Sequence, residues 1–92
     1  MSASADLDHT FTTRLQGEMG PHKWTCAIMT DSQPILGTGK SLKVIATVDG
    51  VTFESSMLPH KGGHMLAIKQ AIQDEIGKHA GDLVTVRLQS AA

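Results

Sequence analysis

The residues with the clearest chemical potential lie together in the stretch 58–66, which reads LPHKGGHML. It combines two imidazoles, one ammonium group and two consecutive glycines. Glycine adopts positive φ and lets another group approach the backbone closely. We expect a helix to begin just after the glycines, and the free N–H groups and positive dipole at the start of a helix favour an anion. The candidate ligand-binding residues are His60, Lys61, Gly62, Gly63 and His64.

Segment 59–66 is therefore predicted to hold a small anion or an acidic ligand, such as a phosphate, a carboxylate or the acidic end of a peptide. The competing interpretation is structural: a tight connection from a strand to a helix, in which the glycines only solve a backbone problem. The stretch is not a nucleotide-binding phosphate loop, because the Gly-x-x-x-x-Gly-Lys-Ser/Thr spacing is absent.

His60 and His64 are four residues apart, a spacing that suits two metal ligands when both lie on one face of a helix. A small metal-dependent or acid–base enzyme using both imidazoles is therefore an alternative. Its third ligand or base would come from His22, His79 or an acidic residue, and nothing in the sequence brings these together. We assign no catalytic residue, no metal and no cofactor, and an enzyme is the less favoured interpretation.

Other residues with reactive side chains are better explained as structure. The stretch GTGKS at 37–41 resembles the end of a nucleotide-binding motif, but a strand rather than a helix is expected to follow it. Cys26 lies in the middle of a predicted strand and reads as a small buried residue. Ser55 and Ser56 lie in a strand rather than in a nucleophile elbow.

Composition narrows the classes of partner. The chain has 92 residues with a formal net charge of −1, which argues against a broad surface for binding nucleic acid. Its aromatic residues, Phe11, Trp24 and Phe53, all fall at strand positions that are expected to be internal. Single-stranded nucleic acid needs several exposed rings to stack on. We therefore expect no nucleic-acid partner.

The remaining composition indicates a cytoplasmic globular protein. The single cysteine excludes an intramolecular disulfide and the usual zinc-binding cysteine pairs. No stretch approaches the roughly 20 apolar residues of a membrane span. The start, MSASADLD, has neither the basic region nor the apolar core of a secretory signal. The predicted location is cytoplasmic, with no membrane association.

Apolar periodicity predicts strands over 9–17, 23–29, 41–48, 51–58 and 83–89. Asp49-Gly50 stands between two of them, and this dipeptide is typical of a two-residue hairpin turn. Apolar residues then recur at spacings of three and four, which predicts an amphipathic helix over 64–76 that ends at Gly77. A single helical turn over 32–36 fits the sequence but is left open.

The fold class predicted from these elements is mainly β with one helix, in the order β-β-β-β-α-β. Five or six strands in so short a chain suggest a small closed or partly open β-barrel, with the helix plugging one end or covering an edge. We expect one barrel domain over 9–89, with flexible tails at 1–8 and 90–92.

Five segments carry a resemblance to a known family, in this order over about 10–88: FTTRL, KWTCAIM, the hairpin V-x-G-V-T-F-x-S-S-M-L-P, GGHMLAIKQAI and GDLVTVRL. With them the chain resembles a bacterial and archaeal family of unknown function, DUF1905. The resemblance implies a small double-split β-barrel, distantly like those of certain bacterial transition-state regulators, and implies no activity. The link between the second and third strands is shorter here than in many relatives.

Three hypotheses follow. The first is a binding or interaction domain without catalysis, with a small anion or acidic peptide bound at 59–66. The second is the enzyme that uses His60 and His64. The third is a regulator-like barrel completed by dimerisation, and the sequence leaves open whether the chain is a monomer or a homodimer.

Overall fold

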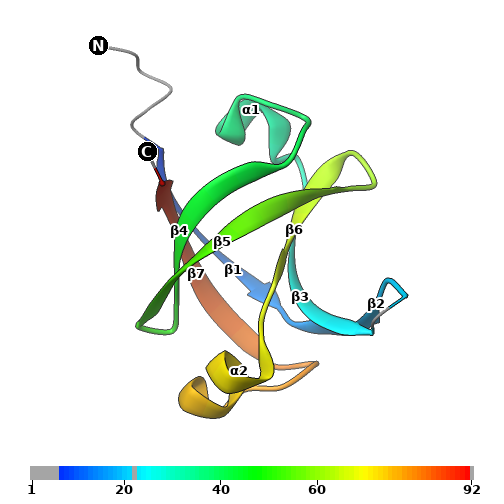
Figure 1. Cartoon of the computed structure of the whole chain (residues 1–92), viewed down its shortest axis with the longest axis vertical. Coiled ribbons are helices and arrows are strands. Elements are labelled where there is room, and N and C mark those ends of the chain that lie inside the picture. The colour runs from blue at the N-terminus through cyan, green and yellow to red at the C-terminus, as the bar shows by residue number, and fades with distance from the viewer. Residues whose placement is uncertain (1–6, 22, 92) are drawn as a thin grey trace.

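The computed structural model describes residues 7–21 and 23–91, and within them the fold is mainly β. Figure 1 shows the strands wrapped around one interior, with a short helix at each end. The elements are β1 (Asp8–Arg14), β2 (Gln16–Met19), β3 (Trp24–Met29), α1 (Gln33–Leu36), β4 (Leu42–Val48), β5 (Val51–His60), β6 (Gly63–Ala67), α2 (Gln70–Ile76) and β7 (Leu83–Ser90).

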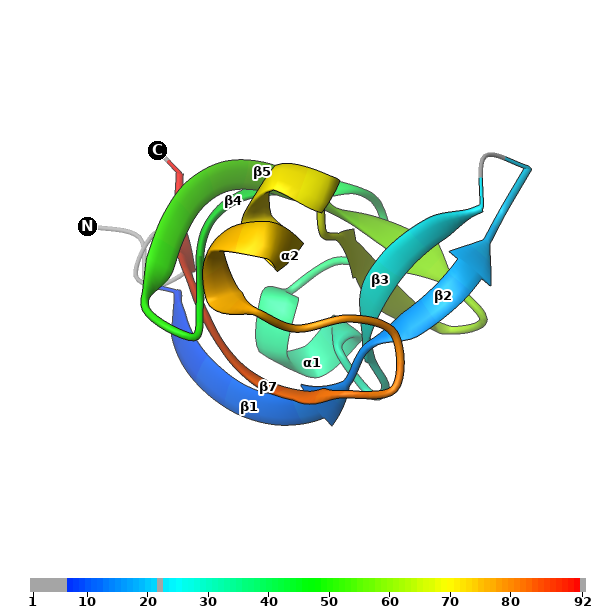
Figure 2. The same cartoon turned by 90° about the horizontal axis from the view of Figure 1, so that it is seen from below.

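The strands form one antiparallel sheet in the order β1-β7-β4-β5-β6-β3-β2. The mainly β class is confirmed, but the predicted strand count and order are wrong, because the described residues contain seven strands and two helices. The edge strands β1 and β2 are separated in the chain only by Leu15. The two edge strands of the sheet therefore follow one another along the chain at Leu15. Figure 2 shows from below how the sheet curls into a half-barrel.

Leu15 interrupts the strand predicted over 9–17 for a physical reason. Its side chain is buried, and its backbone N–H and C=O bond to Asp82 and Gly81 in the loop before β7 instead of to a neighbouring strand. The chain pairs with β7 before this residue and with β3 after it. The single stretch 8–19 thus provides both edge strands of the sheet, β1 and β2.

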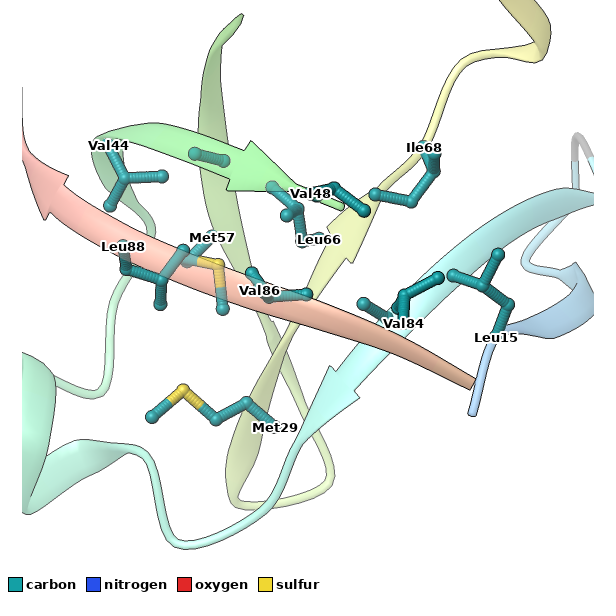
Figure 3. Close-up of a cluster of buried hydrophobic side chains, with 12 residues drawn as sticks. Leu15, Met29, Val44, Val48, Met57, Leu66, Ile68, Val84, Val86 and Leu88 are labelled. Carbon is teal, nitrogen blue, oxygen red and sulfur yellow. The ribbon is translucent and has the colours of Figure 1, made fainter. Parts of the chain in front are cut away.

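The core lies inside the curl and follows the alternation of the strands. Every second residue of β4 and of β7 points inward, which places the small β-branched side chains of both strands in contact. Figure 3 shows these side chains meeting two methionines from the other half of the sheet. The fully or nearly fully buried members include Val44, Val48, Met29, Met57, Leu66, Val84, Val86 and Leu88.

The helix predicted over 64–76 is only partly correct. Its second half forms α2, which begins at Gln70 and ends at Gly77 with a φ of 70°. Its first half is strand β6, which pairs with β5 on one side and with β3 on the other. The backbone N–H and C=O groups of β6 form hydrogen bonds with a strand on each side. This pairing outweighs the helical spacing of its apolar residues. A helical turn does form in 32–36, where the sequence leaves the question undecided, and it is α1.

Two further expectations change with the structure. Trp24 is 42% exposed at the start of β3, so the prediction that it is internal is wrong, whereas Phe11 and Phe53 are half-buried against the core. Most of the predicted N-terminal tail lies outside the described residues. Strand β1 begins at Asp8 and β7 continues through Ser90, so both strands extend into the predicted tails. Neither helix found in 7–21 and 23–91 is long and apolar enough to cross a membrane.

The predicted Asp49-Gly50 hairpin is confirmed, and its aspartate also ties the turn to β7. Both turn residues have positive φ, 46° and 90°, as a type I′ turn requires. One carboxylate oxygen of Asp49 accepts the backbone N–H of Thr85 at 2.9 Å, and the other lies 3.0 Å from the ammonium of Lys78. The hydrogen bond from Thr85, assisted by Lys78, holds the pKa of Asp49 below its usual 3.8 against partial desolvation.

This lowered pKa predicts a pH dependence of stability. The ionised form of Asp49 is favoured by folding, so its contribution is complete above about pH 4 and is lost as the pH falls through the folded-state pKa. Asp49→Asn is expected to destabilise the protein at pH 6, by an amount that shrinks towards pH 3. Urea unfolding of both proteins at the two pH values measures this, and a difference independent of pH would contradict it.

Candidate functional site

The stretch LPHKGGHML forms a β-hairpin, not a connection from a strand to a helix. His60 pairs with Gly63 across a two-residue turn, and the turn residues Lys61 and Gly62 have φ values of 46° and 82°. This is again the pattern of a type I′ turn, whose twist matches the strands it joins. The free helix amides invoked for anion binding therefore do not exist here, and any ligand would be held by side chains and the turn itself.

Gly63 is required for packing. A Cβ atom built on it would overlap the backbone carbonyl oxygen of Met29 and lie 3.2 Å from the Cα of Thr30. The absence of a side chain lets β6 approach β3 closely. Gly62, in contrast, has open space around it and is needed for its positive φ.

His64 is fully buried and joins β6 to the segment that contains α1. Its Nε2 lies 2.8 Å from the carbonyl oxygen of Lys40, and its Nδ1 is hydrogen-bonded to the hydroxyl of Ser32, which is also fully buried. A carbonyl oxygen can only accept, so Nε2–H donates to Lys40. In the neutral ring Nδ1 has no proton, so the Ser32 hydroxyl donates to it. Both ring nitrogens are thereby satisfied inside the protein.

The two histidines point to opposite faces of the hairpin. His64 pairs with Pro59, on the same side as the core pair Met57 and Leu66, while His60 pairs with Gly63 on the outer side. Directly paired residues share a face, and successive residues alternate. The structure therefore does not bring the two imidazoles together. In the part of the chain that the structure describes, no three histidine, cysteine, aspartate or glutamate side chains are grouped so that they could hold a metal.

An open hollow with a volume of about 430 Å³ lies beside the β5–β6 turn. It contains four of the five predicted site residues, and His64 is the one that it lacks. The other lining residues come from β3, the loop after it, and β2, and no sequence pattern indicates them. The lining consists of Gln16, Ile28, Met29, Thr30, Asp31, His60, Lys61, Gly62 and Gly63.

The charges at this hollow are not paired with each other. Lys61 and Asp31 are both exposed, and neither takes part in the two ion pairs found among residues 7–21 and 23–91, which are Lys78–Asp49 and Arg87–Asp8. The carboxamide of Gln33 in α1 donates to the carbonyl oxygen of Gly62 at 3.1 Å. The segment that follows β3 is therefore tied to the hairpin at two points, one buried at His64 and one exposed at Gly62.

The remaining reactive residues have structural positions, as expected. Cys26 is buried, and desolvation raises the pKa of its thiol, which disfavours the nucleophilic thiolate. In the stretch GTGKS, Gly37 ends α1 with a φ of 76°, and β4 begins at Leu42. That stretch is a turn before a strand.

Comparison with known proteins matches most of the chain to one family. Residues 11–88 match the sequence profile described as Domain of unknown function (DUF1905). This range contains both the hairpin and the complete hollow. No curated protein matches the chain.

Proposed function

The chain belongs to the DUF1905 family, and from this premise we propose that it is a small binding domain that holds an acidic ligand in the hollow beside the β5–β6 turn. The observation that carries the proposal is that Lys61, an exposed residue with no ion pair among the described residues, lines this hollow. The partly exposed imidazole of His60 stands beside it in the chain and adds a second hydrogen-bonding group.

The structure of the turn supports this role for Lys61. A non-glycine residue with positive φ is uncommon, and here the two-residue hairpin holds the backbone in that conformation. The backbone of Lys61, and with it the direction of its Cα–Cβ bond, is therefore fixed. Binding a ligand would have to order only the side chain and not the backbone. Binding sites placed on rigid elements lose less conformational freedom when a ligand arrives.

Replacing the charge of Lys61 is expected to weaken binding of an acidic ligand. A single exposed charge-assisted contact is worth about 1 kcal/mol, so Lys61→Gln should lower affinity about fivefold. Titrations with acetate, inorganic phosphate and a short acidic peptide, followed through the backbone amide signals of residues 28–31 and 60–63, would measure it. Lys69→Gln is the matched control, since Lys69 is exposed just before α2, at the other end of the fold.

Two outcomes would separate the possibilities. If none of the three probes moves these amide signals, the hollow does not bind acidic ligands and the proposal fails. If the probes bind equally well to both lysine variants, an acidic ligand binds without Lys61.

The choice between monomer and homodimer and the cytoplasmic location stay predictions. Sedimentation at several concentrations tests the choice between monomer and homodimer.

A further inference from the structure

The hollow offers two opposite charges to a ligand. Lys61 lines it from the turn between β5 and β6, and Asp31 lines it from the loop after β3. Neither forms an ion pair within the described chain, where the ion pairs involve other residues. A purely anionic ligand would meet the carboxylate of Asp31 as well as the ammonium of Lys61. A ligand that carries both charges would match both groups.

We propose that the ligand is a small zwitterion of amino-acid or dipeptide size, with its carboxylate at Lys61 and its ammonium at Asp31. This inference rests on the proposed function and adds the chemical class of the ligand. The volume of about 430 Å³ lies towards the lower end of the range of small-molecule pockets, about 300 to 1,000 Å³, and suits a ligand of this size.

The backbone positions of the two charged residues are fixed in similar ways. Asp31 has a φ of 51° and Lys61 a φ of 46°, both in the left-handed region that few non-glycine residues adopt. Asp31 directly precedes Ser32, whose hydroxyl is held by the buried His64. The imidazole on β6 thus anchors the loop that carries the carboxylate, while the β5–β6 turn carries the ammonium. The fold therefore fixes the backbone positions from which the two charged side chains extend.

The rest of the lining suits the uncharged part of such a ligand. Ile28 is half-buried and supplies an apolar surface, on which an aliphatic side chain can lie. Thr30 and Gln16 are exposed and add a hydroxyl and a carboxamide. The hydroxyl and the carboxamide can each donate and accept hydrogen bonds, so they can pair with both the C=O and the N–H of a peptide group.

The test compares one dipeptide in three forms on the full chain. Alanyl-leucine carries both charges, its N-acetyl derivative only the negative charge, and its C-terminal amide only the positive charge. Backbone amide signals of residues 28–31 and 60–63 are followed during each titration. The free dipeptide is expected to bind, and each blocked form to bind about fivefold more weakly, since each loses one exposed charge pair. Free leucine in parallel shows whether the amino acid alone is enough.

Two charge variants assign the contacts. Asp31→Asn is expected to remove the preference for the free amine over the N-acetyl form, and Lys61→Gln the preference for the free carboxylate over the amide. Asparagine tolerates positive φ, so the first variant should keep the loop conformation. Asp74→Asn and Lys69→Gln serve as controls on exposed residues outside the hollow, and both should keep both preferences.

The results distinguish this inference from the function on which it rests. If the N-acetyl dipeptide binds as tightly as the free dipeptide and Asp31→Asn changes nothing, the zwitterion is overturned while binding of an acidic ligand stands. If only the amide form binds, both are overturned. If no dipeptide form, acetate or phosphate shifts these signals, the proposed function fails together with the inference.

Discussion

Replacing His64 with alanine is expected to lower the free energy of unfolding by about 3 kcal/mol. The imidazole is fully buried, so its removal leaves a cavity between β6 and the α1 segment. It also leaves the buried hydroxyl of Ser32 and the carbonyl group of Lys40 without their partner. Leaving buried polar groups unsatisfied adds to the cost of the lost packing.

Urea unfolding at pH 7 measures this difference, with His60→Ala as the matched control. His60 is a histidine on the same hairpin that lies on its outer face, so its loss should change stability by less than about 0.5 kcal/mol. The hydrogen-bonded amide hydrogens of Ile35, Leu36 and Gly37 should also exchange faster in His64→Ala, because the anchor of α1 is gone. Equal losses in the two variants would show that His64 does not hold the segment.

Gly63→Ala is expected to cost about 3 kcal/mol, at the upper end of the usual cost of overpacking. The added methyl group would overlap the carbonyl oxygen of Met29, which is a backbone atom of the neighbouring strand and cannot rotate away. Strands β3 and β6 would have to separate at this point. The hollow is lined by residues on both sides of that contact, so ligand binding should weaken in the same variant.

Gly62→Ala is the matched comparison, one residue away. Nothing lies within 4 Å of the Cβ position of Gly62, so its substitution costs only the positive φ, about 1 kcal/mol. Thermal or urea unfolding of the two variants should therefore rank Gly63→Ala as clearly more damaging. The reverse order would mean that the turn conformation, and not the approach of β3 to β6, sets the requirement for glycine.

The two hairpins show what local sequence can predict. Asp49-Gly50 predicts its hairpin correctly because alternating strands flank a dipeptide that is typical of the type I′ turn. Lys61-Gly62 has the same pair of positive φ values, but lysine is not a typical first residue of that turn, and the apolar residues after it also fit a helix. Pairing with β3 and β5 decides that β6 is a strand, and those partners are distant in the sequence.

The candidate site was predictable only in part for the same reason. His60, Lys61, Gly62 and Gly63 are consecutive, so their types and spacing drew attention to them. Asp31 reaches the same hollow because Met29 pairs with His64 across the sheet, a contact between residues far apart in the chain. The inward direction of His64 follows from the register of β5 with β6, which the sequence alone does not give.

The place of β7 has a consequence for the order in which the protein folds. Strand β7 lies between β1 and β4, and among the described strands β1 pairs with β7 alone. During synthesis β1 leaves the ribosome long before β7, whereas the β4–β5 and β5–β6 hairpins can form as soon as they emerge. Closing a loop over nearly the whole chain is slow compared with forming a hairpin. Strand β1, although made before all the strands that β7 joins it to, is thus expected to enter the sheet late.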